Sequence, residues 1–352
     1  MMFLIPLLFV SSLADCSLFI DYSGCVKAEV TSKCSGAVII PKEYTCIADY
    51  GFTNSQISQV TFQSNSAVTI GSSAFQQAPL RTITAPGGYA SIGSYSFDST
   101  FLSTFTLTSS TNYGINVFIN CKSLVSVIIK DDMTIPKQMF AGCSKLNMIQ
   151  GQNYITDIAS GAFNGCTALT QFSFDNIKSV GSYAFALSGL HKITLNPTTK
   201  FGENAFEESK VASVNFNGAD KVVPYMLRDT TQLSILSGLE SIKYIQQHAF
   251  EGCSKLSSIH LYEGLSTLGE EVFSGSVKTI FYHGTTKPKC DENALSNKVV
   301  VYVSDNYMST SFCTVTVTKA HCSNKEKINT TSGKCEPCSG TGSGNDGVTD
   351  SC

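Results

Sequence analysis

The stretch Gly161–Phe174 reads GAFNGCTALTQFSF, and the stretch Ala249–Leu261 reads AFEGCSKLSSIHL. Both contain A-F-x-G-C-[ST]-x-L, followed by apolar residues at alternate positions. Self-similarity of this kind at a fixed, short period indicates a chain built from stacked repeats. The Phe of A-F, which we call the anchor, sets the register of the whole chain.

The anchor pattern recurs twelve times, with gaps of 21–23 residues. The anchors are Phe52, Phe75, Phe97, Phe118, Phe140, Phe163, Phe185, Phe206, Leu227, Phe250, Phe273 and Leu295. An aliphatic or aromatic residue stands five positions before nearly every anchor, and an alternating apolar pair follows it. Alternation predicts a short strand with one buried face. So short a unit cannot enclose a core, and its inward residues are buried only when successive coils stack.

These features predict an α/β repeat solenoid with parallel strands. The Ala-Phe stretch is expected to form a short helical turn that packs a ring beside a small neighbour. Burial of each Phe contributes about 1.5–3 kcal/mol, so the anchors should form a continuous aromatic spine. The motif recurs because every coil needs a residue of similar size at the same position of the core.

Four coils carry a cysteine three residues after the anchor, at Cys121, Cys143, Cys166 and Cys253. Buried free thiols that pack as small apolar side chains are the favoured interpretation. Disulfides between consecutive coils are the alternative.

The N-terminus predicts export. A nine-residue apolar run, Met2–Val10, precedes Ser12-Leu13-Ala14, which fits a small-x-small cleavage site. Residues 1–14 are therefore expected to be a signal peptide, although no Lys or Arg precedes the run; a buried first strand is the alternative. The run is too short to span a bilayer, and no later segment qualifies, so no transmembrane segment is expected. We expect a secreted chain and leave open whether it is associated with a cell surface.

Ten further cysteines lie near the two ends, as an oxidised extracellular chain would have. They are Cys16, Cys25, Cys34, Cys46, Cys290, Cys313, Cys322, Cys335, Cys338 and Cys352. We expect them to be disulfide-bonded, with a pairing that the sequence leaves open. A solenoid needs caps at both ends. The expected organisation is thus a Cys-rich cap over 15–46, repeats over 47–303, and a cap and tail over 304–352.

The tail contains two short motifs. Cys335-x-x-Cys338 fits a zinc or redox site as well as a disulfide, and we favour the disulfide in a secreted chain. Asn329-Thr330-Thr331 is the single N-x-[ST] acceptor and is the expected glycosylation site.

The unit I-x-x-x-A-F-x-x-C-x-x-L-x-x-I-x-[IL]-P resembles the BspA-like leucine-rich repeats of surface and secreted proteins. The resemblance covers about residues 47–303, although the Pro is mostly missing and the anchors Leu227 and Leu295 are not Phe. It implies a right-handed, curved solenoid with parallel strands on one face. It also implies adhesion to host cells or matrix proteins.

Residues that alternate with the buried strand positions should line an exposed sheet face. The candidate protein-binding residues are Gln171, Ser173, Lys192, Thr194, Ser213, Asn215, Ser258, His260, Tyr262, Phe281 and His283. Most are small polar residues that also suit a plain solvated sheet. The expected hot spot is the cluster formed by His260, Tyr262, Phe281, Tyr282 and His283, because interfaces favour aromatic anchors with few charges. The repeat unit that contains Tyr282 is shortened, so the alternative is that the Tyr282 side chain points into the core.

Composition and motifs exclude other classes of function. The net charge is −3 with no basic cluster beyond Lys325-Glu326-Lys327, so nucleic acid is not an expected partner. No hydrolase, zinc-protease or nucleotide-binding motif is present, and the five histidines are scattered. We predict no enzyme, cofactor or metal. A protein-binding adhesin is the leading hypothesis, ahead of a variable surface antigen without one ligand and an unrecognised hydrolase.

Overall fold

The computed structural model describes residues 16–319, together with the backbone of 326–328 and 335–337. The signal-peptide prediction, Asn329, Cys322 and Cys352 lie outside the described residues, as do the side chains of Cys335 and Cys338. The chain divides into two compact units. Unit 1 comprises the residues up to Phe172 together with Asn176–Gly189, and unit 2 comprises Ser173–Asp175 and the residues from Leu190 onward.

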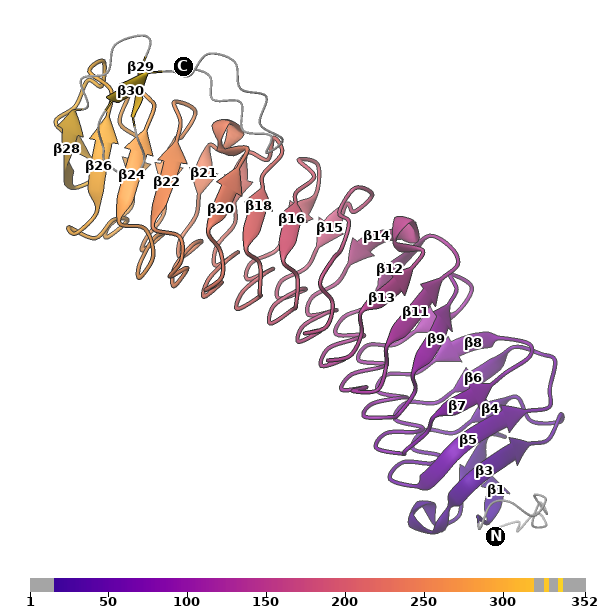
Figure 1. Ribbon diagram of the computed structural model, residues 1–352. Coiled ribbons are helices and arrows are strands. Elements are labelled where there is room, and N and C mark those ends of the chain that lie inside the picture. Colours follow the sequence, from indigo (N-terminus) through magenta and orange to yellow (C-terminus); the bar gives the residue numbers. More distant parts are fainter. Residues whose placement is uncertain (1–15, 320–325, 329–334, 338–352) are drawn as a thin grey trace. The chain divides into compact units, whose positions relative to one another are not determined.

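Each coil contributes one strand before its anchor and, in most coils, one strand after it. Successive coils place equivalent strands side by side within each unit (Figure 1). We call the two sets pre-anchor and post-anchor strands. Both sets pair in parallel with a register shift of one repeat, for example Ile47 with Ile70 and Val60 with Ile83.

In unit 1 the pre-anchor strands form two sheets. The first has the order β1-β2-β4-β6-β8-β10 and the second contains β12-β14-β15. Their bounds are β1 Leu18–Ile20, β2 Val26–Ala28, β4 Cys46–Ile47, β6 Val68–Ile70, β8 Tyr89–Ile92, β10 Asn112–Tyr113, β12 Met133–Ile135, β14 Ile155–Ile158 and β15 Ser179–Val180. The post-anchor strands are β3 Ser35–Ile40, β5 Gln56–Phe62, β7 Thr82–Thr84, β9 Thr104–Leu107, β11 Ser126–Ile129 and β13 Met148–Gln150.

Unit 2 repeats this arrangement. Its pre-anchor strands are β17 Lys200–Phe201, β19 Lys221–Val222, β21 Tyr244–Ile245, β23 Thr267–Leu268 and β25 Lys289–Cys290. Its post-anchor strands are β16 Lys192–Thr194, β18 Ser213–Asn215, β20 Ile235–Ser237, β22 Ser258–Leu261, β24 Thr279–Tyr282, β26 Val300–Val303 and β28 Val315–Lys319. The short β27 Ser311–Phe312 pairs with β28 in antiparallel fashion, as β29 Glu326–Ile328 does with β30 Cys335–Pro337.

The prediction of α/β class is wrong because the described residues contain almost no helix. Helix there is confined to three 3₁₀ turns, η1 Thr31–Lys33, η2 Gln152–Tyr154 and η3 Leu239–Ser241. None of the described helices is long and apolar enough to cross a membrane. The chain is a parallel β-solenoid in each unit.

The Ala-Phe stretch is a run of turns in which left-handed residues recur. The residue two before the anchor has a positive φ in all twelve coils, from Tyr50 (57°) to Asn293 (57°). Most coils add a second such residue two after the anchor, such as Asn54 or Gly165. A left-handed residue interrupts an α-helix, which is the physical reason for the missing helices. We call the five residues from two before to two after the anchor the anchor turn.

Anchor turns are joined to each other by backbone hydrogen bonds. Phe52 N donates to Ala74 O of the next coil (2.7 Å), and Asn54 N donates to Gln76 O (2.9 Å). Within a turn the bonds close three residues back, as from Ser55 N to Phe52 O (3.2 Å). The turns thus form a third hydrogen-bonded wall beside the two strand sets, which satisfies backbone groups that a loop would leave open.

The predicted continuous aromatic spine is confirmed in unit 1, and in unit 2 the anchors Leu227 and Leu295 interrupt it. Consecutive anchor rings from Phe52 to Phe185 stack with centroids 5.2–5.7 Å apart. In unit 2, Phe250 and Phe273 stack at 5.7 Å. Leu227 is equally buried at the same position of its coil. The core of each coil is therefore one ring or one Leu deep, with the aliphatic strand residues around it.

The four cysteines that follow an anchor are buried free thiols, as favoured. Each Sγ lies near a backbone carbonyl of the preceding coil's anchor, from 2.9 Å for Cys121 to 3.3 Å for Cys166. Thr230 makes the same contact with its hydroxyl (3.2 Å). In these five coils the position holds a small side chain whose donor meets that carbonyl, whereas the Phe75 coil has the buried Ala78 there. Burial raises the pKa of the Cys253 thiol to about 12 and raises the pKa of Cys143 well above its usual value.

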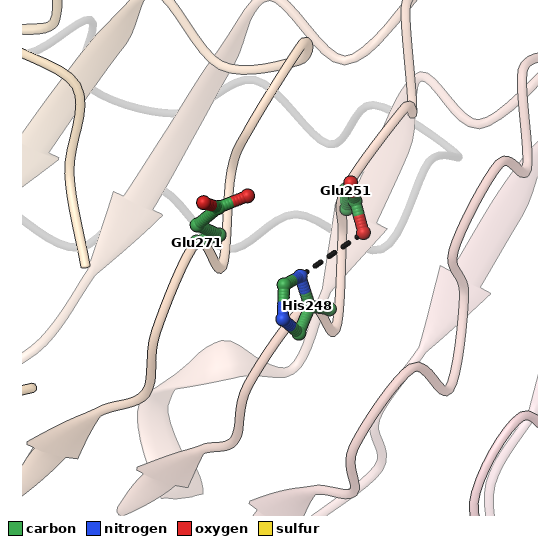
Figure 2. Close-up of side chains that lie close together, drawn as sticks. All are labelled: His248, Glu251 and Glu271. Carbon is green, nitrogen blue, oxygen red and sulfur yellow. Dashed lines mark ion pairs between the residues drawn. The ribbon is translucent and has the colours of Figure 1, made fainter. Parts of the chain in front are cut away.

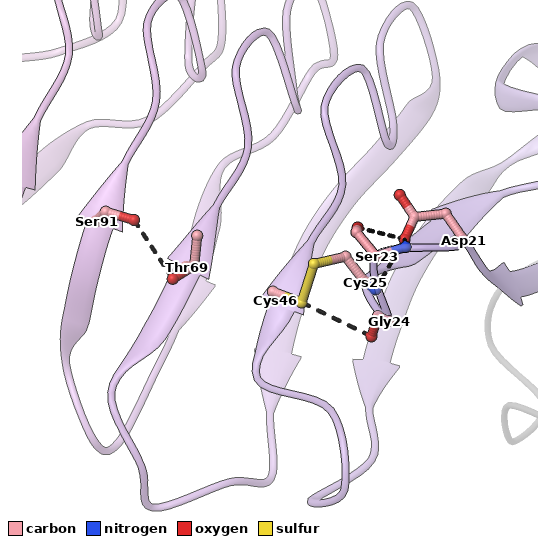
Figure 3. The surroundings of a disulfide bond; sticks show 7 residues. All are labelled: Asp21, Ser23, Gly24, Cys25, Cys46, Thr69 and Ser91. Atoms are coloured by element: carbon pink, nitrogen blue, oxygen red, sulfur yellow. Dashed lines mark hydrogen bonds between the residues drawn. A yellow bond between two sulfur atoms is a disulfide. The ribbon is translucent and has the colours of Figure 1, made fainter.

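Three disulfides fix the two ends. They join Cys16 to Cys34, Cys25 to Cys46 and Cys290 to Cys313. Figure 3 shows the disulfide between Cys25, the residue before β2, and Cys46 of β4, which lies in one cross-strand row with Thr69 and Ser91. The antiparallel strands β1 and β27 lie at the outer edges of their sheets. Each end therefore has an antiparallel strand and at least one cross-link between neighbouring coils.

Candidate protein-binding face

The candidate face is the outer side of the post-anchor strands of unit 2. Alternate residues of β16, β18 and β20 point outward while Ile193 and Val214 are buried. The outward rows are set by the register, for example Thr194 beside Asn215 and Ser237. Ile235, at 61% exposure, is the large apolar residue of this region.

The structure places most predicted residues on an accessible surface. Lys192, Thr194 and His283 are exposed, and Ser213, Asn215, Ser258, His260 and Tyr262 are half-buried. Gln171 in unit 1 and Ser173 in unit 2 are also exposed. No strand is formed over residues 171–174, so the expected strand of that coil is absent from the described chain.

The expectation that Phe281 is accessible is wrong, because its side chain is fully buried (0% exposure). Phe281 lies in one cross-strand row with His260 and Tyr302. Its ring stacks on both neighbours, with centroids 5.0 Å and 5.5 Å away. Tyr282 faces inward, with its ring 4.8 Å from Phe312. Phe281 is a packing residue of the cluster and is not available for contact.

The predicted cluster is otherwise brought together by adjacent coils. His283 stacks on both His260 and Tyr262, with centroids 5.1 Å apart in each pair. Nδ1 of His260 and Nε2 of His283 are 2.8 Å apart, a hydrogen bond that requires one protonated and one unprotonated nitrogen. We call His260, Tyr262, Phe281, His283 and Tyr302 the ring cluster. It offers one aromatic patch with imidazole donors and acceptors.

Sequence reasoning missed Tyr302 as a member of the ring cluster. The sequence signal for Tyr302 is its position one repeat after Phe281. Tyr302 lies in the largely apolar run Val300–Val303, in which alternation of apolar and polar residues does not tell buried positions from exposed ones. Local crowding lowers the pKa of His283, because partial burial disfavours its charged form. The cluster therefore favours a neutral His283 at neutral pH.

A shallow hollow of about 270 Å³ lies in unit 1. It is lined by Ser109, Thr111, Tyr113, Asp132, Met133, Thr134 and Pro136. Asp132 is the one carboxylate among these residues and has no His or second carboxylate beside it in the lining. An acid–base pair for hydrolysis is not formed there.

The fold and the face define a class: a repeat protein whose coils form parallel β-solenoids with an open, mostly polar sheet face. The chain belongs to the BspA type leucine rich repeat family. That family's model matches in six copies, over residues 31–135, 114–234 and 221–299. This confirms the resemblance read from the sequence.

One solved structure supports the fold, and two others are similar to this chain in sequence and coverage only. A leucine-rich repeat protein from Bacteroides ovatus is 19% identical, with a TM-score of 0.59, over 88% of this chain and all of that one. A leucine rich cell surface protein from Faecalibacterium prausnitzii is 16% identical (TM-score 0.41), covering 77% of this chain and 95% of that one. The pneumococcal vaccine antigen PcpA is 13% identical (TM-score 0.42), covering 88% and 100%. No curated protein matched.

Proposed function

We propose that this chain is a secreted or surface-exposed protein-binding module. In this proposal the outer face of β16, β18, β20, β22 and β24 contacts a protein on a host cell or in the matrix. The observation that carries the proposal is the ring cluster, an aromatic–imidazole patch on and next to β22, β24 and β26. Known protein interfaces are enriched in aromatic residues and depleted of charge at their centres.

The rest of the face supports the same proposal. Thr194, Asn215 and Ser258 provide hydroxyls and amides that can pair with a partner's backbone, and Lys192 provides the charge at the rim. The family and its solved members make extracellular placement the natural proposal, with adhesion as its biological form.

Binding is tested with the full mature chain against purified matrix glycoproteins and epithelial-cell membrane extract. The variant His260→Ala/Tyr262→Ala/His283→Ala removes three accessible rings of the cluster and leaves the rings of Phe281 and Tyr302. We expect saturable binding by the wild type and at least a tenfold weaker affinity for the variant, since loss of a hot spot costs about 2 kcal/mol or more.

The matched control is Tyr244→Ala, which removes an exposed ring (42% exposure) from the pre-anchor strand β21. Its binding should equal that of the wild type. The proposal fails if no probe binds in a saturable way, which would favour a surface antigen without one dedicated ligand. It also fails if Tyr244→Ala weakens binding as much as the triple variant does.

A further inference from the structure

A second cluster of side chains lies on the anchor turns of unit 2. It consists of His248, Glu251 and Glu271, shown together in Figure 2. One ligand atom from each residue lies within 4.8 Å of the other two, and Nδ1 of His248 is 3.0 Å from Oε2 of Glu251. No motif in the sequence joins these residues, because they come from two coils.

The backbone of the anchor turns brings the three residues together. His248 and Glu271 occupy the same position, two before the anchors Phe250 and Phe273, and both have positive φ (55° and 45°). Equivalent positions of adjacent coils lie side by side, and His248 N donates to Glu270 O (2.9 Å). Glu251 is three residues after His248, and its N–H donates to His248 O (3.2 Å), so it lies on the same side of the turn.

Neighbouring residues hold the imidazole in place. The Tyr225 ring stacks on His248 with centroids 4.8 Å apart and planes 6° from parallel. The guanidinium of Arg228 lies 5.1 Å from the Tyr225 ring and forms an ion pair with Glu207. The ion pairs of Arg228 are with Glu207 and Asp229, which lie outside the cluster, although its charge also acts on Glu251.

One atom of the cluster is left without a hydrogen bond of good geometry. Nδ1 of His248 is buried, and despite its 3.0 Å approach to Glu251 it has no hydrogen-bond partner. The side chains themselves remain accessible, with 20% exposure for His248 and 31% for Glu251. A small ion and its water can therefore reach the cluster from solvent.

From this geometry we propose that His248, Glu251 and Glu271 form a binding site for a divalent transition metal, with Zn²⁺ as the best fit. One imidazole nitrogen and two carboxylate oxygens, completed by water, are a ligand set that zinc accepts in tetrahedral geometry. Zinc bonds to these atoms are about 2.0–2.2 Å long, so binding requires the two half-buried carboxylates to rotate inward. The imidazole disfavours Ca²⁺ and Mg²⁺, which prefer oxygen ligands.

The bound metal links two successive coils, because His248 and Glu251 belong to the Phe250 coil and Glu271 belongs to the Phe273 coil. A metal that binds the folded chain and not the unfolded one raises stability in proportion to the logarithm of its concentration. The site is independent of the proposed binding face, since the ring cluster lies on the post-anchor strands.

The test uses the full, disulfide-bonded chain after treatment with a chelator and dialysis. Titration calorimetry with zinc chloride at neutral pH should give one saturable equivalent, and the melting temperature should rise with zinc concentration. His248→Gln and Glu271→Gln should each weaken zinc binding at least tenfold and abolish the rise in melting temperature. Cobalt(II) gives an independent readout, through a visible absorption spectrum that both variants should lose.

Two matched controls locate the site. Glu270→Gln changes the exposed sequence neighbour of Glu271, which is not part of the cluster. His260→Gln removes one histidine of the His260–His283 pair in the ring cluster. Both variants should bind zinc like the wild type. Absence of saturable binding in the wild type overturns the proposal. So does wild-type affinity in His248→Gln, loss of binding in His260→Gln, or equal affinity for Mg²⁺ and Zn²⁺. Circular dichroism establishes that each variant is folded.

Discussion

At the scale of single residues, the fold depends on the anchor. From Phe52 to Phe185 each anchor ring fills one coil and stacks on the ring of the next, so its loss leaves a gap in a core that is one ring deep. Phe163 illustrates this, with centroid distances of 5.5 Å to Phe140 and 5.2 Å to Phe185. The same position tolerates Leu at Leu227, which is also fully buried. Shape and apolar volume are therefore what the position requires.

Phe163→Ala should lower the free energy of unfolding by about 3–5 kcal/mol, the usual cost of deleting a buried ring. Phe163→Leu should lose less, because other coils already carry Leu there. Urea titration followed by circular dichroism measures both. Tyr183→Ala, at an exposed position (45%) of the next anchor turn, is the control and should stay within about 0.5 kcal/mol of the wild type. Equal losses at Phe163 and Tyr183 would contradict the role of the spine.

At the scale of the element, the anchor turn is the feature that sequence reasoning misjudged. An Ala-Phe stretch with small neighbours is compatible with a helical turn, and no single copy excludes that. A comparison of the twelve copies does contain a signal for left-handed turns. Across all copies, the residues at the two left-handed positions include Asn, Gly, Tyr, Ser and Gln but no Val, Ile or Thr. β-branched residues disfavour a positive φ, so their absence indicates left-handed turns.

The ring cluster is the element in which pH should matter. Partial burial lowers the pKa of His283, so the folded chain binds its proton less readily than the unfolded chain does. The unfolded state then holds more protons in the window below the ordinary histidine pKa of about 6.5, and stability falls as the pH is lowered through that window. A second proton on the His260–His283 pair also removes the nitrogen that accepts their hydrogen bond.

Thermal unfolding from about pH 7.5 to about pH 5.5 should therefore show a fall in melting temperature that His283→Asn reduces. The exposed His191 on the same side of the unit serves as the comparison, and His191→Asn should leave the slope unchanged. A pH slope that is unaffected by His283→Asn would rule out this role of the pair.

At the scale of the whole molecule, stability is a sum over neighbouring coils. Each inner coil pairs with the coil before it and the coil after it. The disulfides cross-link the coils near the two ends, where the terminal coil has a neighbour on one side only. Cys25–Cys46 joins the residue before β2 to β4, and Cys290–Cys313 joins β25 to the region before β28. The effect of a cross-link should accordingly remain within its own unit.

Replacing Cys290 and Cys313 by Ala should cost about 3 kcal/mol, since the bond closes a loop with a sequence separation of 23 residues. Hydrogen exchange measured by mass spectrometry should increase in β25, β27 and β28 and remain unchanged in β4 and β6. The reciprocal variant, with Ala at Cys25 and Cys46, should give the opposite pattern. Exchange that rises equally in both units would show global unfolding instead of local opening.

The sequence by itself determined the repeat, the parallel strands, the ring spine and the buried thiols. Each of these follows from positions counted along one coil, and a period copied twelve times leaves little ambiguity about what faces inward. It also determined most of the outward residues of the candidate face, because alternation within a strand decides them.

Only the tertiary structure decided what depends on contacts between coils. The disulfide pairs, the burial of Phe281 between His260 and Tyr302, and the meeting of His248, Glu251 and Glu271 all depend on which side chains adjacent coils place opposite each other. The physical reason is that lateral contact is set by register and by left-handed turns. A residue's own neighbours in the sequence do not specify either of these.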